Sequence, residues 1–254
     1  MKHWIIIMLL FFNPFFHCQN ASKYNDEPTF ELDSFHKIKK EFFVENGKLA
    51  SIYQVNLNGK IDGICYDYHL NGRMKSILFF KDGNIDSSQS WYYPTGVKQA
   101  DLFYLNGRHF GCQYLYDSLG KLEQVYFVSS VNDSCISSIV NLNQNGSIKN
   151  IIGGLITTIF RSDTLNKQDS AVVIFYVTVP PFYDIKTTII EKKIGNYIKR
   201  EPCELNIISN NSGYMYYKKL DSVGEYDVGL HITINNSKMR STFSDSTFIP
   251  LIVK

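Results

Sequence analysis

The chain has 254 residues, and its 26 Lys and Arg against 24 Asp and Glu leave a formal net charge of +2. This balance argues against a dedicated nucleic-acid binder, which normally carries a clear basic excess. Hydrophobic residues make up 44% of the chain and charged residues 20%, so it can bury a core. Aromatic residues reach 15%, with 17 Tyr and 18 Phe, and this bias favours strands over helices. We therefore expect one or two β-rich domains and no nucleic-acid partner.

The first eighteen residues have the pattern of an export signal. A short basic start precedes the unbroken apolar run Ile5–Phe12, which is the order found in secretory signal peptides. Cys18 stands where a bacterial lipoprotein signal is cut, although the residues before it are larger than is usual there. We predict a signal peptide over 1–18, lipidation of Cys18 and a linker over 19–40; a buried N-terminal strand is the alternative. No apolar run approaches the ~20 residues of a membrane-spanning helix.

The remaining cysteines give no sign of a metal site. They form no CxxC pair, and no histidine stands at zinc-ligand spacing, so we predict that no metal is bound. Cys135 and Cys203 are candidates for a disulfide, and four buried free thiols are the alternative. The four cysteines are Cys65, Cys112, Cys135 and Cys203.

Glycine recurs at a nearly fixed spacing through the first half of the chain. The central units are 63–76, 87–100 and 111–124; each begins with a small residue, has a tyrosine five positions later and a glycine four positions after that. Such internal periodicity predicts structural units that stack on one another. The main set, with spacings of 25, 24, 24 and 26, is Gly47, Gly72, Gly96, Gly120 and Gly146, and a second set with a period of 24 is Gly59, Gly83 and Gly107.

The residues around these glycines predict hairpins. A glycine every 11 to 13 residues would break each helix, whereas short aromatic and β-branched segments between turns suit strands. A single hairpin is not stable alone in water, so we expect the units to form one antiparallel meander sheet over 41–150. The dipeptides that favour two-residue turns are Asn58-Gly59, Asn71-Gly72, Asp82-Gly83 and Asn106-Gly107.

Residues 87–99, together with 58–63, resemble the MORN-variant repeat, the bacterial form of the membrane occupation and recognition nexus motif. That repeat is similar to Gly-x4-Tyr-Tyr-x2-Gly-Lys-Leu-Lys, followed by an aromatic strand and Asn-Gly-Lys. The resemblance covers about 41–150 and implies a repeat sheet, but it implies little about activity. Members of the family include antitoxins of toxin–antitoxin modules and many exported proteins. Ser87 departs from the motif, and the copy at Gly146 lacks its tyrosine, so the array is expected to end there.

The segment 165–254 predicts a second β region, because the period disappears and strand-like runs follow one another. Tyr226 comes two residues after a glycine and begins an alternating run, which resembles the tyrosine corner of immunoglobulin-like domains. Val228 stands where such domains carry their second cysteine. We predict an all-β chain whose meander is followed by a small β-sandwich, immunoglobulin-like or of another type. The expected strands are 171–179, 185–193, 204–208, 214–219, 226–234 and 247–253.

Motifs for catalysis are missing from the sequence. There is no P-loop, HExxH, GxSxG or GxGxxG, and the histidines do not pair at ligand spacing. We therefore predict no enzyme and no cofactor. Four aspartates of the repeats are candidates for a carboxylate row on one sheet face, and solvated turn residues are the favoured alternative. These aspartates are Asp62, Asp82, Asp86 and Asp101.

The aromatic residues of the repeats are the strongest candidates for a functional surface. Tyrosine and tryptophan are favoured anchors of protein interfaces, so we predict partner binding by Trp91, Tyr92, Tyr93 and Tyr104; an internal core is the alternative. The leading hypothesis is an exported, non-enzymatic protein, membrane-anchored as a lipoprotein, that mediates protein–protein contact in the cell envelope. The alternatives are an antitoxin or immunity protein that blocks a toxin, and a glycan-binding envelope protein.

Overall fold

The computed structural model describes residues 35–129, 136–160, 164–166, 170–193, 198–201, 206–209, 213–219, 223–238 and 240–254. All regular elements in these residues are strands, so the predicted all-β class is confirmed. Cys18, Cys135 and Cys203 lie outside the described residues, as does the segment 1–34. The signal peptide, the lipidation and the disulfide therefore stay predictions.

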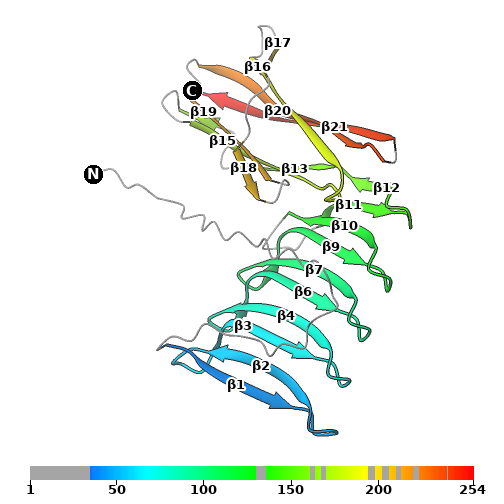
Figure 1. Ribbon diagram of the computed structural model, residues 1–254. Helices are drawn as coiled ribbons and strands as arrows, with labels where there is room; N and C mark the ends of the chain where they lie inside the picture. The colour runs from blue at the N-terminus through cyan, green and yellow to red at the C-terminus, as the bar shows by residue number, and fades with distance from the viewer. Residues whose placement is uncertain are drawn as a thin grey trace.

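The first half of the chain forms one antiparallel sheet of 12 strands, called here the meander sheet. Its main path is β1-β2-β3-β4-β6-β7-β9-β10-β11-β12, while β5 pairs with β4 and β8 pairs with β7. In Figure 1 these strands lie side by side in chain order, from β1 upward. The strands are β1 (Lys37–Phe42), β2 (Leu49–Val55), β3 (Ile61–Tyr68), β4 (Met74–Lys81), β5 (Asn84–Ile85), β6 (Ser87–Tyr92), β7 (Lys98–Leu105), β8 (Arg108–His109), β9 (Gly111–Tyr116), β10 (Leu122–Val128), β11 (Ile136–Leu142) and β12 (Ile148–Gly153).

Most hairpin loops of the meander sheet contain three residues and a bulge. Between β3 and β4 the Gly72 N–H donates to the carbonyl oxygen of His69 at 2.8 Å, and the His69 N–H donates to that of Arg73 at 2.8 Å. Gly72 has a φ of 87°, the left-handed conformation of a G1 bulge after a type I turn. The same two bonds recur around Gly59, Gly96, Gly120 and Gly146.

The prediction of two-residue turns is therefore wrong at Asn71-Gly72 and at Asn58-Gly59. A type I′ turn needs a positive φ at both residues, and here only the glycine has one. The asparagine side chain instead stabilises the loop as an Asx turn, because Asn71 Oδ1 accepts a hydrogen bond from the Arg73 N–H at 3.0 Å.

Two-residue turns are confirmed at Asp82-Gly83 and Asn106-Gly107. Both residues of each pair have a positive φ, at 49° and 86° in the first and 52° and 81° in the second. The glycine N–H groups point to the preceding unit, where Gly83 donates to Ile61 at 2.7 Å and Gly107 donates to Ile85 at 2.8 Å. These bonds tie successive units together.

The second half forms two sheets, the four-stranded β13-β15-β19-β18 and the five-stranded β14-β21-β20-β16-β17, and is called here the sandwich. This is the ABED and GFC strand order of immunoglobulin sandwiches, with β14 parallel to the last strand. Tyr226 is buried near the start of β20, which corresponds to strand F, and Val228 is buried beside it. The strands are β13 (Ile156–Phe160), β14 (Thr164–Leu165), β15 (Ser170–Val177), β16 (Asp184–Lys193), β17 (Ile198–Glu201), β18 (Asn206–Ser209), β19 (Gly213–Lys219), β20 (Gly224–Asn236) and β21 (Ser241–Val253).

The two halves meet without a long linker. The first four residues of β1 lie in the segment that we assigned to a linker, and β13 begins before the predicted sandwich, because neither strand carries the repeat period. At the junction Gly153 has a φ of 78°, and a Cβ there would lie 2.3 Å from the backbone oxygen of Ser137. Only glycine fits this crossing.

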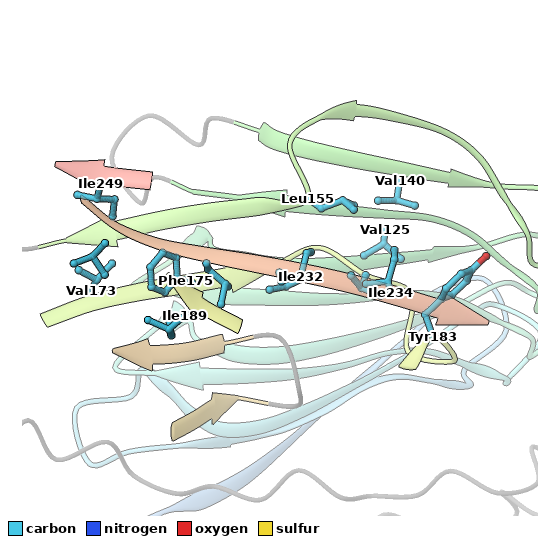
Figure 2. Close-up of a cluster of buried hydrophobic side chains, with 14 of the residues drawn as sticks. Val125, Val140, Leu155, Val173, Phe175, Tyr183, Ile189, Ile232, Ile234 and Ile249 are labelled. Carbon is cyan, nitrogen blue, oxygen red and sulfur yellow. The ribbon is translucent and has the colours of Figure 1, made fainter. Parts of the chain in front are cut away.

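One hydrophobic core spans the end of the meander sheet and the sandwich. Val125 of β10 and Val140 of β11 belong to the same buried cluster as Ile232 and Ile234 of β20 (Figure 2). Leu155, between β12 and β13, joins this cluster and donates its N–H to Asp245 Oδ2 at 2.7 Å. The sandwich therefore packs on the last strands of the meander sheet, whereas β1–β7 extend away from it (Figure 1).

Candidate interaction surface

The strand register defines two faces of the meander sheet. Residues directly opposite in an antiparallel pair share a face, and neighbours along a strand alternate between faces. The register places Ser76 opposite Trp91 and Trp91 opposite Ala100 on one face, called here the Trp91 face. The opposite face, called here the Phe103 face, carries Ile64, Tyr66, Ile77, Phe79, Asp101, Phe103, Tyr114, Val125, Phe127 and Val140.

The Trp91 face contains several buried side chains. The buried residues on this face are Cys65, Ser76, Leu78, Gln89, Ala100 and Gln113. Two of them, Gln89 and Gln113, are long polar side chains, and each lies next to a bulge in its strand. A buried amide needs hydrogen-bond partners, so these side chains require an explanation.

Gln113 hydrogen-bonds to backbone groups at the bulge. Its Oε1 accepts the Phe103 N–H at 2.8 Å, and its Nε2 donates to the carbonyl oxygens of Phe103 at 3.1 Å and Phe110 at 3.0 Å. Gln89 repeats this arrangement one unit earlier with Phe79 and Asp86. Neither glutamine was predicted from the sequence, although their identical position in two units was the available signal.

The bulges also explain the small residue that opens each unit. Gly63, Ser87 and Gly111 have φ values of 102°, 59° and 79°, a region in which most side chains are strained. Ser87 is the one that carries a side chain, and its hydroxyl donates to Asp86 Oδ2 at 3.2 Å.

The cysteine on the Trp91 face is not an activated nucleophile. Burial raises the pKa of the Cys65 thiol from 9.0 to about 12, and the neighbouring Asp67 carboxylate acts in the same direction. Asp67 is held by the hydroxyls of Ser51 and Ser76, which donate to it at 2.6 and 2.8 Å. A reactive cysteine needs a lowered pKa, so this cluster stabilises the sheet and has no means to attack a substrate.

The structure divides the four aromatic residues predicted to bind a partner. Trp91 and Tyr104 lie on the Trp91 face, where both are partly buried. Tyr92 follows Trp91 in β6 and points to the opposite side. Tyr93 lies in the loop after β6, where its hydroxyl donates to the carbonyl oxygen of Tyr116 at 2.9 Å. The four residues do not form one patch, because side chains alternate along a strand and the loop turns Tyr93 away.

The Phe103 face carries one phenylalanine at the same position in three successive units. Phe127 is 0% exposed because the sandwich covers it, with the Tyr176 ring centroid 5.0 Å from its own. Cys112, opposite Phe127 on β9, has its Sγ 3.9 Å from the carbonyl oxygen of Val177. Phe103 and Phe79 keep 38% and 37% of their surface exposed. Our sequence analysis did not select these residues, although they stand 24 residues apart.

A compensated polar cluster lies between the covered and the exposed part of the Phe103 face. Asp101 accepts hydrogen bonds from Ser90 Oγ at 2.7 Å and Tyr116 Oη at 3.2 Å, and Lys98 Nζ contacts both carboxylate oxygens at 2.9 and 3.0 Å. Burial, and then Asp101, raises the pKa of Tyr116 above its ordinary value. Each group is satisfied, so the cluster leaves no uncompensated charge on this face.

The candidate carboxylate row does not form, in agreement with the favoured alternative of turn residues. Asn56 Nδ2 contacts both Asp62 at 3.5 Å and Asp82 at 3.0 Å, and Asp86 accepts the Asn106 N–H at 3.0 Å, so these three serve turns and strand ends. Asp101 lies apart from them in the middle of β7. Among the described residues no group of three or more His, Cys, Asp and Glu could hold a metal ion.

Comparisons with known proteins found no match for this chain. No family model matches it, and neither a curated protein nor a solved structure matches it significantly. Within the part of the chain that the structure describes, no helix has the length and apolarity to cross a membrane.

Proposed function

We propose that this is a non-enzymatic protein of the cell envelope that binds a protein partner on the exposed part of its Phe103 face. One observation carries the proposal: a single repeat position is buried under the sandwich at Phe127 but exposed at Phe103 and Phe79. The covered position supports the proposal, because Phe127 is buried by another layer and the two exposed positions carry the same side chain.

The exposed phenylalanines offer enough apolar area to contribute to binding. A fully buried aromatic side chain removes 150–250 Å² from water, so covering the remaining third of each ring contributes roughly 2 kcal/mol at ~25 cal/mol/Å². Exposed aromatic side chains on one face are a common feature of interaction sites.

The location and the family belong to the same proposal. We propose that residues 1–18 direct export and that a lipid on Cys18 holds the protein at the membrane. The loop hydrogen bonds that recur with the glycine spacing support a relationship to MORN-variant repeats.

Chemical cross-linking of intact cells, followed by purification of the full-length protein, tests this proposal. Wild type is expected to carry a cross-linked protein band that the Phe79→Ser/Phe103→Ser variant loses. Phe248→Ser is the matched control, because Phe248 is 51% exposed but lies on the sandwich. A band that persists in the double variant would refute the proposed surface. A Cys18→Ala variant that stays in the membrane fraction would refute the proposed anchor.

A further inference from the structure

The uncovered part of the Phe103 face has the area of an ordinary protein interface. Six strands of the main path, β1, β2, β3, β4, β6 and β7, lie before the part that the sandwich covers. At about 4.8 Å between strands and about 3.4 Å per residue, they present a surface of roughly 600–750 Å². A standard interface buries about 800 Å² on each partner. The free face therefore has room for one further folded domain.

The molecule itself contains an example of how this face is covered. Over Phe127 the cover is a β-sheet: Tyr176 belongs to β15, and its ring also packs against Phe110 at 5.9 Å. The face is continuous from this interface to the free part, because Phe79, Phe103 and Phe127 occupy β4, β7 and β10, two strands apart in each step. The step is about 10 Å, which is also twice the strand spacing of any sheet laid over it.

The surroundings of the two exposed rings restrict what can bind. Asp101 beside Phe103 is compensated by Lys98, so a partner meets no unpaired carboxylate there. Lys81 lies two positions after Phe79 in β4, and Lys75 lies four positions before it; both lysines are exposed at the border of the face. This arrangement fits a partner whose contact surface has an apolar, aromatic centre and a neutral or acidic rim.

We infer that the partner is a β-sheet domain of a second protein, which lays one sheet over β1–β7 and places aromatic or β-branched side chains on Phe79 and Phe103, as Tyr176 does on Phe127. The inference rests on the proposed function and names the kind of partner that the same surface binds.

Site-specific photo-cross-linking in intact cells tests the inference. The photoreactive amino acid p-benzoylphenylalanine replaces Phe79 or Phe103 in the full-length chain, and Phe248 serves as the control position. Mass spectrometry then identifies the residue of the partner to which each position is joined. We expect adducts from positions 79 and 103 to one protein, on strands of one β-sheet, and no such adduct from position 248.

Five other results would overturn the inference. An adduct to a helical segment of another protein would leave the proposed function standing but exclude a sheet partner. Adducts to lipid, to a second copy of this chain or to residues 19–34 of the same chain would assign the face to a different occupant. If neither position forms an adduct, both the inference and the proposed function fail.

Discussion

The meander sheet and the sandwich bury their apolar side chains in different ways. In the sandwich, β15 alternates strictly, and Val173, Phe175 and Val177 are fully buried because a second sheet lies over them. In the meander sheet, most residues of β3 are only partly buried, since a single layer has no opposing sheet. On its Phe103 face, Val125, Phe127 and Val140 are 0% exposed next to the sandwich, and Ile52 of β2 is 4% exposed.

Cover, and not residue type, therefore decides which part of a repeated sheet becomes core. The same phenylalanine position is core at Phe127 and surface at Phe103. A single-layer sheet with a large apolar face is complete only when another layer packs on it, and the sandwich provides that layer for the last strands alone.

Truncation of the three equivalent phenylalanines gives the largest contrast. Phe127→Ala is expected to lower the free energy of unfolding by about 3–5 kcal/mol, as for other buried aromatic residues. Phe103→Ala and Phe79→Ala are expected to lower it by less than about 1 kcal/mol, because both side chains are exposed to solvent over more than a third of their surface. Urea denaturation of the purified variants measures these differences. An equal loss of unfolding free energy at the three positions would contradict the distinction between covered and exposed phenylalanines.

Removal of a bulge glutamine is the next largest effect. Gln113→Leu leaves the Phe103 N–H without its side-chain acceptor and removes the amide bonds to the carbonyl oxygens of Phe103 and Phe110, so we expect a loss of about 2–4 kcal/mol. Gln99→Leu, at an exposed position of β7, is the control and should change stability by less than about 0.5 kcal/mol. If both variants unfold at the same urea concentration, the buried amide does not hold the bulge.

The buried thiol predicts a loss of stability at alkaline pH. The pKa of Cys65 is raised from 9.0 to about 12 in the folded protein, so its contribution is complete below pH 9 and decreases as the pH rises toward 12. Unfolding measured between pH 8 and 11 should show a steeper decline for wild type than for Cys65→Ala. Parallel curves would mean that the thiol ionises equally in both states.

The smallest effect is a stabilisation at Ser87. Ser87→Gly removes the strain of a positive φ, but glycine also has greater freedom in the unfolded chain. We expect a net increase of about 0.5–1 kcal/mol in the free energy of unfolding. Ser87→Val should destabilise the protein, because a β-branched residue tolerates this conformation poorly. Thermal unfolding of the two variants with wild type should place them on opposite sides of it.

Local features of this fold could be predicted from the sequence, and features that depend on distant contacts could not. Asp82-Gly83 indicated its type I′ turn because both residues tolerate a positive φ, and Tyr226 indicated the start of its strand. Asn71-Gly72 misled us, since the same dipeptide also suits a longer loop with an Asx bond. The exposure of Phe103 depends on where the sandwich packs, which no periodicity records.

Hydroxyl-radical footprinting of Phe79, Phe103 and Phe127 tests most directly whether the free face is a binding surface, because it measures the exposure of each side chain in the unmodified protein. In the purified protein, Phe79 and Phe103 should be oxidised and Phe127 protected. In intact cells we predict that Phe79 and Phe103 become protected as well, while Phe248 on the sandwich stays reactive. Equal oxidation of Phe79 and Phe103 in purified protein and in cells would contradict the account, since it would mean that no partner covers them.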